Sequence, residues 1–375
     1  MHTFEIKLQI SHSIYHDLLG IPAMQKVKTI YRSNYYQKKG ILQIELHHHS
    51  YTDRRTGLQG NSYYLVLQIN ANVLLGSDRV FALKLNQFSR QQICNALRHR
   101  LYEINEFRKI RLDKLDQKIW ITERVDLARD LNVTDPELTS LLCNLGMPYG
   151  YHNMQRVPIN KPWEILYGES CYFGSKSRRL NFYVKQKALI NTKRKCDVDM
   201  TDLEHIFRIE IQVLKPGVIY AGRRTATKRS IGLYLDEDYV NNYFLSELEM
   251  AFGKERYVSH SIAIKLIDEC SESLKEKKKM KEVINLIHKM HGLYELGKAL
   301  KEGDPALVSK FGNYYTFKRR HLKKIRQLGI NPATIPDTYG ISELPSLYDL
   351  LNAEILCEKD QQMLLGVDTG RIKIG

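Results

Sequence analysis

The stretch "CYFGSKSRRLNFYVKQKAL", residues 171–189, joins a glycine-containing turn to a segment whose two faces differ in character. Side chains alternate across a β-strand, so residues of the same parity share a face. After the turn, Leu180 and Phe182 would point to one side of the strand and Tyr183 to the other. The pattern predicts a hairpin over 171–187 that buries one face and leaves the other open.

Two further segments show a similar alternation. One carries Arg208 and Glu210 on one face and apolar residues on the other, and a second carries Asp126 and Asp130 on a shared face. The corresponding strands are expected at residues 206–213 and 121–130. If the apolar faces pack beneath helices, the polar faces meet on the open side of one sheet. Tyr183 would then lie beside carboxylates and cations.

That combination of side chains suits phosphoryl transfer. A tyrosine hydroxyl has a pKa near 10 and is a poor nucleophile at neutral pH. A divalent cation, Mg²⁺ or Mn²⁺, held by Asp126 and Glu210 could polarise a phosphate. The flanking phosphates would be bound by Arg178, Arg179 and Lys185. The alternative is structural, because strands that face solvent often carry charges and Arg208 could simply pair with a neighbouring carboxylate.

The rest of the chain favours an α+β fold. Further strands are expected at 3–10, 40–49 and 62–75, and helices at 88–110 and 235–253. This order predicts a mainly antiparallel sheet with helices on one face, formed by residues 1–255. Residues 256–350 change character and predict a helical domain, and residues 351–375 are expected to form a peripheral tail.

Within the helical domain, the segment "DPALVSKFGNYYTFKRRHLKKIRQLGINP" (304–332) contains a helix, a glycine turn and a second, basic helix at about 314–328. This order is typical of a helix-turn-helix unit, whose second helix contacts DNA. The expected DNA-binding side chains on that helix are Lys318, Arg319, Arg320 and Lys323. The alternative is a solvated, charged face of a helical bundle.

The composition agrees with a polyanionic partner. Lysine and arginine number 57 against 42 aspartates and glutamates, which gives a net charge of +15. None of the six cysteines lies in a C-x-x-C pair, so free thiols in a reducing cytoplasm are expected. The N-terminus does not resemble a signal peptide and no apolar run is long enough for a membrane span, so no membrane partner is expected.

Three segments together resemble a known family. "RVDLARD" (124–130), "YFGSKSRRLNFYVKQ" (172–186) and "FRIEIQVLK" (207–215) resemble, in the same order, motifs of Rep_trans-type rolling-circle replication initiators. Conjugative-element relaxases and filamentous-phage-type replication nickases have related patterns. The resemblance implies a metal-dependent tyrosine DNA endonuclease and strand transferase (a nickase). It also makes 1–255 a nicking domain that starts rolling-circle replication of a plasmid or phage through a phosphotyrosine intermediate.

On that reading Tyr183 is the nucleophile, assisted by Lys185 and Arg208. The expected metal ligands are Asp126, Glu210, Asp130 and Glu45. Glu45 replaces an acidic residue that relatives often carry five positions after the tyrosine, where this chain has Ala188. The expected partner is origin DNA, single-stranded at the nick site. A host helicase and a second copy of the chain are candidate partners.

Several alternatives stay open. The run "HHH" (47–49) would place His47 and His49 on one strand face, as in nickases that bind their metal through histidines, with Tyr183 and Lys187 as the tyrosine element. Tyr172 is a second possible nucleophile. A relaxase for conjugative transfer would use the same chemistry. A non-catalytic origin-binding protein would need only the basic helices.

Overall fold

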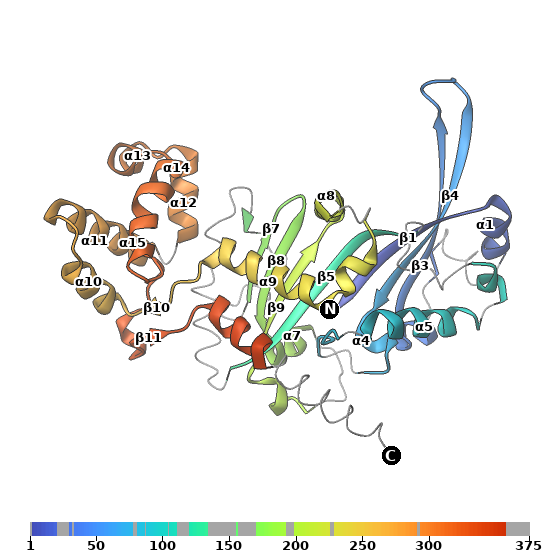
Figure 1. The fold of residues 1–375 in the computed structure, drawn as a ribbon, viewed down its shortest axis with the longest axis horizontal. Coiled ribbons are helices and arrows are strands. Elements are labelled where there is room, and N and C mark those ends of the chain that lie inside the picture. Colours follow the sequence, from blue (N-terminus) through green and yellow to red (C-terminus); the bar gives the residue numbers. More distant parts are fainter. Residues whose placement is uncertain are drawn as a thin grey trace, which may run out of the picture.

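The protein has an α+β fold built on a nine-stranded sheet (Figure 1). The structure is a computed structural model, and it describes residues 2–20, 30–31, 34–77, 81–86, 88–103, 105–110, 120–133, 155–156, 170–192, 199–225, 229–290 and 293–357. Every strand pair within these residues is antiparallel. The predicted fold class is therefore confirmed.

The central sheet runs in the order β2-β3-β4-β1-β5-β9-β8-β7-β6. Its strands are β1 (Thr3–Ile10), β2 (Ile30–Tyr31), β3 (Ile41–Thr52), β4 (Gln59–Asn70), β5 (Trp120–Asn132), β6 (Gln155–Arg156), β7 (Ser170–Gly174), β8 (Arg178–Val184) and β9 (Ile206–Val213). The three strands predicted to carry the polar face, β5, β9 and β8, are adjacent. They are adjacent because segments that are far apart in the sequence pair with one another.

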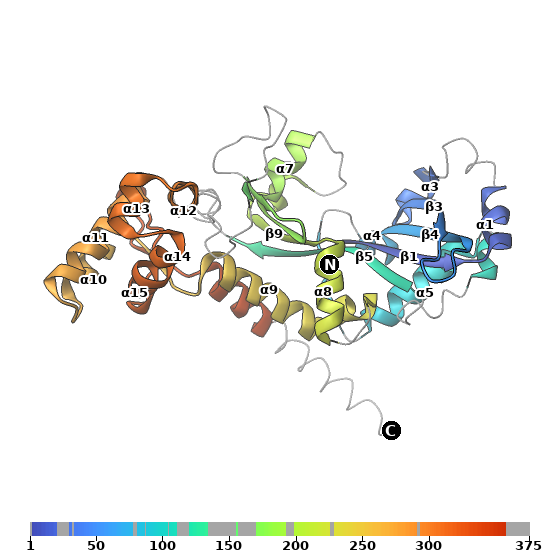
Figure 2. The same ribbon diagram turned by 90° about the horizontal axis from the view of Figure 1, so that it is seen from above.

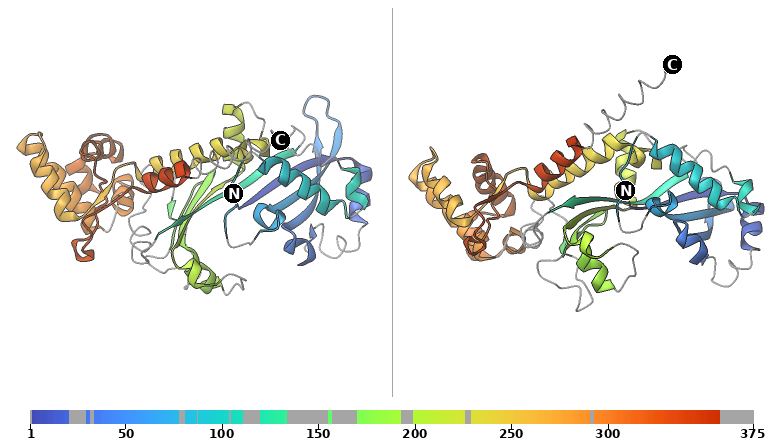
Figure 3. Two further views of the ribbon diagram at one scale, coloured as in Figure 1. Left: turned by 60° about the horizontal axis from the view of Figure 1, so that its bottom comes forward. Right: turned by 90° about the horizontal axis from the view of Figure 1, so that it is seen from below.

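Most helices cover one face of this sheet (Figures 2 and 3). The helices of the sheet unit are α1 (His12–Leu19), α3 (Asn34–Lys38), α4 (Ala71–Leu74), α5 (Ser89–Leu101), η1 (Asn105–Lys109), α7 (Lys185–Thr192), η4 (Thr201–Leu203), α8 (Lys215–Thr225), η5 (Ile231–Leu235) and α9 (Glu237–Phe252). On the covered face, the buried rings of Phe182 and Phe207 stack, and Phe252 of α9 meets Phe182 edge-on at 4.9 Å. The apolar parity of β8 and β9 therefore forms the core, as predicted.

The polar residues of β5, β8 and β9 lie on the opposite face of the sheet, which we call the open face. It is not bare, because α7 lies over this side near β8 and β9 (Figure 2). The predicted hairpin arm ends at Val184, and Lys185 begins α7 instead of continuing the strand. Leu189 of α7 packs with Leu203 of η4 in a small separate cluster.

A second unit follows the sheet unit. Its elements are β10 (Tyr257–Val258), α10 (His260–Glu269), α11 (Leu274–Lys289), α12 (Leu293–Glu302), α13 (Pro305–Phe311), α14 (Tyr314–Thr316), a π-helical segment (Phe317–Leu322), α15 (Lys323–Gln327), η7 (Asp337–Tyr339) and β11 (Glu343–Leu344). These helices have a hydrophobic core of their own, which begins at Val258, while the sheet core reaches Phe252. The predicted change of character near residue 255 thus coincides with a change of core.

The predicted tail is wrong for its first residues. Residues 347–357 form a helix whose Leu347, Leu351 and Ile355 are buried in the core of the sheet unit. Their spacing of four places them on one helical face. The helical unit is therefore inserted between α9 and this last helix, and residues 358–375 lie outside the described part. Within the described residues, no helix is both long and apolar enough to cross a bilayer.

Candidate functional site

The open face brings together three rows of polar residues across β8, β9 and β5. In the first row, Tyr183 pairs with Arg208, and Arg208 pairs in turn with Asp130. Two residues along each strand, Glu210 lies between Asn181 and Ala128. Residues directly opposite each other on neighbouring strands have their Cβ atoms about 5 Å apart. The predicted Tyr183 and Arg208 therefore share one site with two of the predicted carboxylates, Asp130 and Glu210.

The third row of this site is Arg179, Gln212 and Asp126. Asp126 and Asp130 are four residues apart on β5, which corresponds to about 13 Å along an extended strand. Of the two predicted aspartate ligands, Asp130 is therefore the one in the row of Tyr183, with Arg208 between them. Asp126 lies at the far end of the site.

The centre of the site is a buried ion pair. The side chain of Arg208 is 0% exposed and donates from Nε and Nη2 to the two carboxylate oxygens of Asp130, at 2.5 and 2.6 Å. The backbone N–H of Ala82 donates to the same carboxylate at 2.8 Å. Although burial opposes ionisation, these hydrogen bonds and the charge of Arg208 hold the pKa of Asp130 below its usual value. The pair is thus charged at neutral pH, and it fixes the guanidinium beside Tyr183.

The Tyr183 hydroxyl is strongly disfavoured as an anion. Burial raises its pKa above the usual value, the negative charge of Glu210 raises it further, and Arg208 partly offsets both. Lys185, at the start of α7, is buried with its Nζ 5.8 Å from the centroid of the tyrosine ring. A phenol in this setting acts as a nucleophile only if a neighbouring base removes its proton as it reacts.

Glu210 is the carboxylate best suited to that task. It is buried, and burial raises its pKa; the charge of Asp126 raises it further, while Arg208 and Lys185 act in the opposite direction. A carboxylate with a raised pKa is a stronger base than an ordinary glutamate. It neighbours Tyr183 diagonally across the β8–β9 pair.

A divalent cation has two possible carboxylate ligands here, Asp126 and Glu210, which are close enough for one to raise the pKa of the other. Asp126 already accepts two hydrogen bonds from Arg124, both at 2.7 Å, and one from Thr3. Among the described residues, no group of three or more histidines, cysteines or acidic residues is arranged to hold a metal ion. Mg²⁺ is often held by one or two carboxylates together with substrate phosphates and water. The side chains fit that partial role and do not form a complete cage.

One member of the site was not expected from the sequence. His2 precedes β1, donates its backbone N–H to the carbonyl oxygen of Asp126 at 2.9 Å, and has its Nδ1 buried without a hydrogen-bond partner among the described residues. Burial lowers the pKa of His2 to about 3, and the positive charges of Arg208 and Lys185 contribute. The imidazole is therefore neutral at physiological pH. Nothing in the N-terminal sequence reveals this position, which depends on how β1 pairs with β5.

Two predicted site residues lie elsewhere. Glu45 is on β3, four strand steps from β9, or about 19 Å at the usual spacing. It bonds to His47 at 2.6 Å instead of completing the site. Arg178 has the parity of the apolar face and forms an ion pair with the buried Glu247 of α9, so it is not on the open face. Arg179 is exposed there, as predicted.

The histidine alternative for the metal is not assembled either. His47 and His49 do share a strand face, with ring centroids 6.2 Å apart. They are on β3, however, and not beside Tyr183, and Lys187 belongs to α7 instead of extending the tyrosine strand. The other tyrosine, Tyr172 of β7, pairs with Asn181 on the strand next to the site.

In the helical unit, the predicted glycine turn is present: Gly312, with φ +76°, separates α13 from a continuous helical stretch over 314–327. Arg319, Arg320 and Lys323 are exposed, and Tyr315 on the same side is 66% exposed. These positions recur at i, i+4, i+5 and i+8 and form one stripe. Lys318 instead is half-buried, and burial lowers its pKa. It is therefore not part of the exposed stripe.

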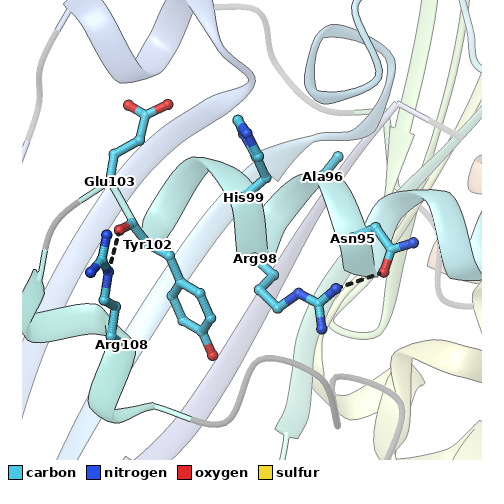
Figure 4. A pocket seen from close by; sticks show the side chains of 7 residues that line it. All are labelled: Asn95, Ala96, Arg98, His99, Tyr102, Glu103 and Arg108. Atoms are coloured by element: carbon cyan, nitrogen blue, oxygen red, sulfur yellow. Dashed lines mark hydrogen bonds between the residues drawn. The ribbon is translucent and has the colours of Figure 1, made fainter.

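The surface hollows add little to this site. The hollow in Figure 4 is lined by α5 and η1, which pack on the covered side of the sheet. Two of its side chains bond within the same segment, Arg98 to Asn95 and Arg108 to the carbonyl oxygen of Tyr102, and Glu103 pairs with Lys39. A second hollow, of about 350 Å³, is bordered by Asp130 at one edge of the site.

Comparisons with protein-family models, with curated proteins and with solved structures found no match to this chain. What the protein does is therefore inferred from the chemistry of its own residues.

Proposed function

We propose that the protein is a DNA nickase and religase that starts rolling-circle replication, with Tyr183 as the nucleophile. The observation that carries this proposal is the row Tyr183–Arg208–Asp130 on the open face, with Glu210 diagonal to the tyrosine. A surface that only displayed charge would have no need to bury an ion pair beside a phenol. The motif order that resembles Rep_trans-type initiators points to the same chemistry.

The reaction follows from the positions of these groups. The Tyr183 oxygen attacks the phosphorus of a DNA phosphodiester while its proton passes to Glu210. The bond from phosphorus to the 3′ oxygen breaks, and that oxygen leaves as a 3′-hydroxyl after taking a proton. The 5′ phosphate is then joined to Tyr183. Attack by a 3′-hydroxyl on the phosphotyrosine reverses the step and reseals the strand.

The cations of the site stabilise the charge on the reacting phosphate. Arg208 is held in place by Asp130 before substrate arrives, so it needs no reorganisation during the reaction. Lys185 supplies a second buried positive charge near the ring. Asp126 would hold a divalent cation together with phosphate oxygens and water, which leaves Glu210 to accept the Tyr183 proton; such a cation supplies Lewis-acid stabilisation of the phosphate when bound.

Binding to the duplex part of the origin is assigned to the exposed stripe of the second unit. Arg319, Arg320 and Lys323 neutralise phosphates, and Tyr315 adds an exposed aromatic ring beside them. The stripe and the tyrosine site lie on two units, each of which has its own hydrophobic core. Binding and cutting should therefore be separable by substitution. A protein that binds the origin without cutting it would keep the stripe and not depend on Tyr183.

The experiment is relaxation of supercoiled plasmid DNA that carries the origin, with Mg²⁺ or Mn²⁺. Tyr183→Phe should abolish relaxation while the affinity for origin DNA stays within about twofold of the wild type. Tyr172→Phe, on the adjacent strand, is the matched control and should relax DNA normally. Relaxation that survives Tyr183→Phe would refute the assignment. A wild-type protein that binds the origin but never relaxes it would favour the non-catalytic alternative.

A further inference from the structure

The β3–β4 hairpin extends well beyond the sheet (Figure 1). The neighbouring strand β1 pairs with β4 only from Tyr63 onward, and β2 pairs with β3 only at Ile44 and Glu45. Among the described strands, residues 50–52 and 59–61 therefore pair only with each other. Residues 48–59 of this ribbon are exposed, so their side chains are available for a partner.

The tip of the ribbon is basic, and hydrogen bonds close its turn. Asp53 accepts the backbone N–H groups of Arg55 and Thr56 at 2.7 and 3.2 Å, and its own N–H donates to the carbonyl oxygen of Leu58 at 2.8 Å. Gly57 takes φ +71°, which closes the turn. Arg54 and Arg55 project from this fixed turn and are exposed.

Behind the tip, an aromatic ring is held open to solvent. Tyr51 pairs with Gly60 across the ribbon, and a Cβ on Gly60 would come within 2.7 Å of the Tyr51 ring. The ring therefore lies against the glycine backbone, in the arrangement by which an aromatic residue covers a cross-strand glycine. Tyr51 is nevertheless 53% exposed. One ring face is supported by the ribbon, and the other is free.

Further rings lead from Tyr51 back to the sheet. Tyr51 has the parity of His49 and His47, which is the parity of the open face. The ring of His49 meets that of Tyr64 edge-on at 5.7 Å, and Lys7 Nζ lies 3.8 Å from the centroid of the Tyr64 ring. The face thus carries rings at roughly two-residue intervals, with cations at both ends. We call Tyr51, His49, His47 and Tyr64 the aromatic track.

We propose that the aromatic track and the arginine tip of the β3–β4 hairpin bind single-stranded DNA by stacking unpaired bases on the rings. Stacked rings beside cations are how sequence-tolerant single-strand binding surfaces work, because every base has a π face. A duplex offers no free base faces, so the track discriminates against it. His47 and His49 then have a role that requires no metal, while His48 has the other parity and stacks on Tyr63 at 4.9 Å.

This inference shares the DNA substrate of the proposed function, but it is tested by binding alone. The probe is a fluorescein-labelled oligothymidine, measured by fluorescence anisotropy without a divalent cation and in the Tyr183→Phe background. Tyr51→Ala should weaken binding by about fivefold or more, the lower end of what one base–aromatic stack contributes. Tyr51→Phe keeps the ring and should bind normally. Tyr339→Ala, which removes another exposed tyrosine, is the matched control.

Arg54→Ala combined with Arg55→Ala should reduce the slope of log affinity against log salt by about 1.4, since each phosphate contact on a single strand contributes about 0.7. Affinity for a blunt duplex should not change with Tyr51→Ala. The inference is overturned if Tyr51→Ala binds oligothymidine like the wild type, or if it loses duplex binding to the same extent. If the hairpin variants lose single-strand binding but the wild type never nicks, the inference stands and the proposed function fails.

Discussion

Removing Arg208 should strongly destabilise the sheet unit, because the substitution leaves a buried carboxylate without its partner. Arg208 is fully buried and makes two short hydrogen bonds to Asp130, whose side chain is only 13% exposed. Breaking a buried pair of this kind by removing one partner costs about 3–5 kcal/mol. Arg208→Met should lower the free energy of unfolding by that amount at pH 7.5. The double variant Arg208→Met/Asp130→Leu removes both charges and should recover most of it.

The destabilisation by Arg208→Met should also depend on pH. In the wild type the pKa of Asp130 is below its usual value, so the pair contributes stability at neutral pH and loses it as pH falls through that lowered pKa. Without Arg208, burial is opposed only by the Ala82 N–H and the charge of Lys185, so the pKa of Asp130 rises. The carboxyl group then takes up a proton at mildly acidic pH, and the penalty of Arg208→Met should shrink between pH 7.5 and pH 4.5. Urea unfolding followed by tryptophan fluorescence measures both effects. A loss below about 1 kcal/mol, or a penalty that grows on acidification, would contradict the buried-pair account.

Three further predictions concern Glu210, the exposed stripe of the helical unit and His2. Glu210→Gln should abolish relaxation yet stabilise the fold at pH 8 in urea titrations, because the raised pKa of Glu210 shows that the fold disfavours its charged form; a less stable variant would contradict it. Arg319→Ala/Arg320→Ala should weaken origin binding in gel shifts and flatten its salt dependence, while cleavage of a single-stranded oligonucleotide persists; the exposed Lys265→Ala should change neither. The His2 pKa of about 3 lies below its unfolded value, so stability should fall as pH drops from about 6.5 towards 3, and His2→Phe should flatten that slope.

The alternation of apolar and polar residues along single strands was enough to predict which side chains share the open face. The apolar parity of β8 and β9 was sufficient to place Tyr183, Arg208 and Glu210 on one face. The same rule could have excluded Arg178, which shares its parity with Leu180 and therefore points beneath α9. The last helix could also have been predicted, since Leu347, Leu351 and Ile355 recur at every fourth residue.

What the sequence did not provide was the register between strands that are distant in the chain. Whether Asp126 or Asp130 shares the row of Tyr183 and Arg208 depends on how β5 pairs with β9, which no local pattern encodes. Glu45 failed for a related reason, because an acidic residue on a polar strand face can lie anywhere across a nine-stranded sheet. His2 enters the site only because β1 lies next to β5.

The proposal of tyrosine catalysis is tested most directly by locating the covalent intermediate. The wild-type protein is incubated with Mn²⁺ and a single-stranded oligonucleotide that spans the origin, digested with a protease, and analysed by tandem mass spectrometry. A nucleotide joined through its 5′ phosphate to Tyr183, and absent from Tyr183→Phe, is the expected result. An adduct on Tyr172 or any other residue, or strand cleavage that leaves no adduct on the protein, would contradict the mechanism.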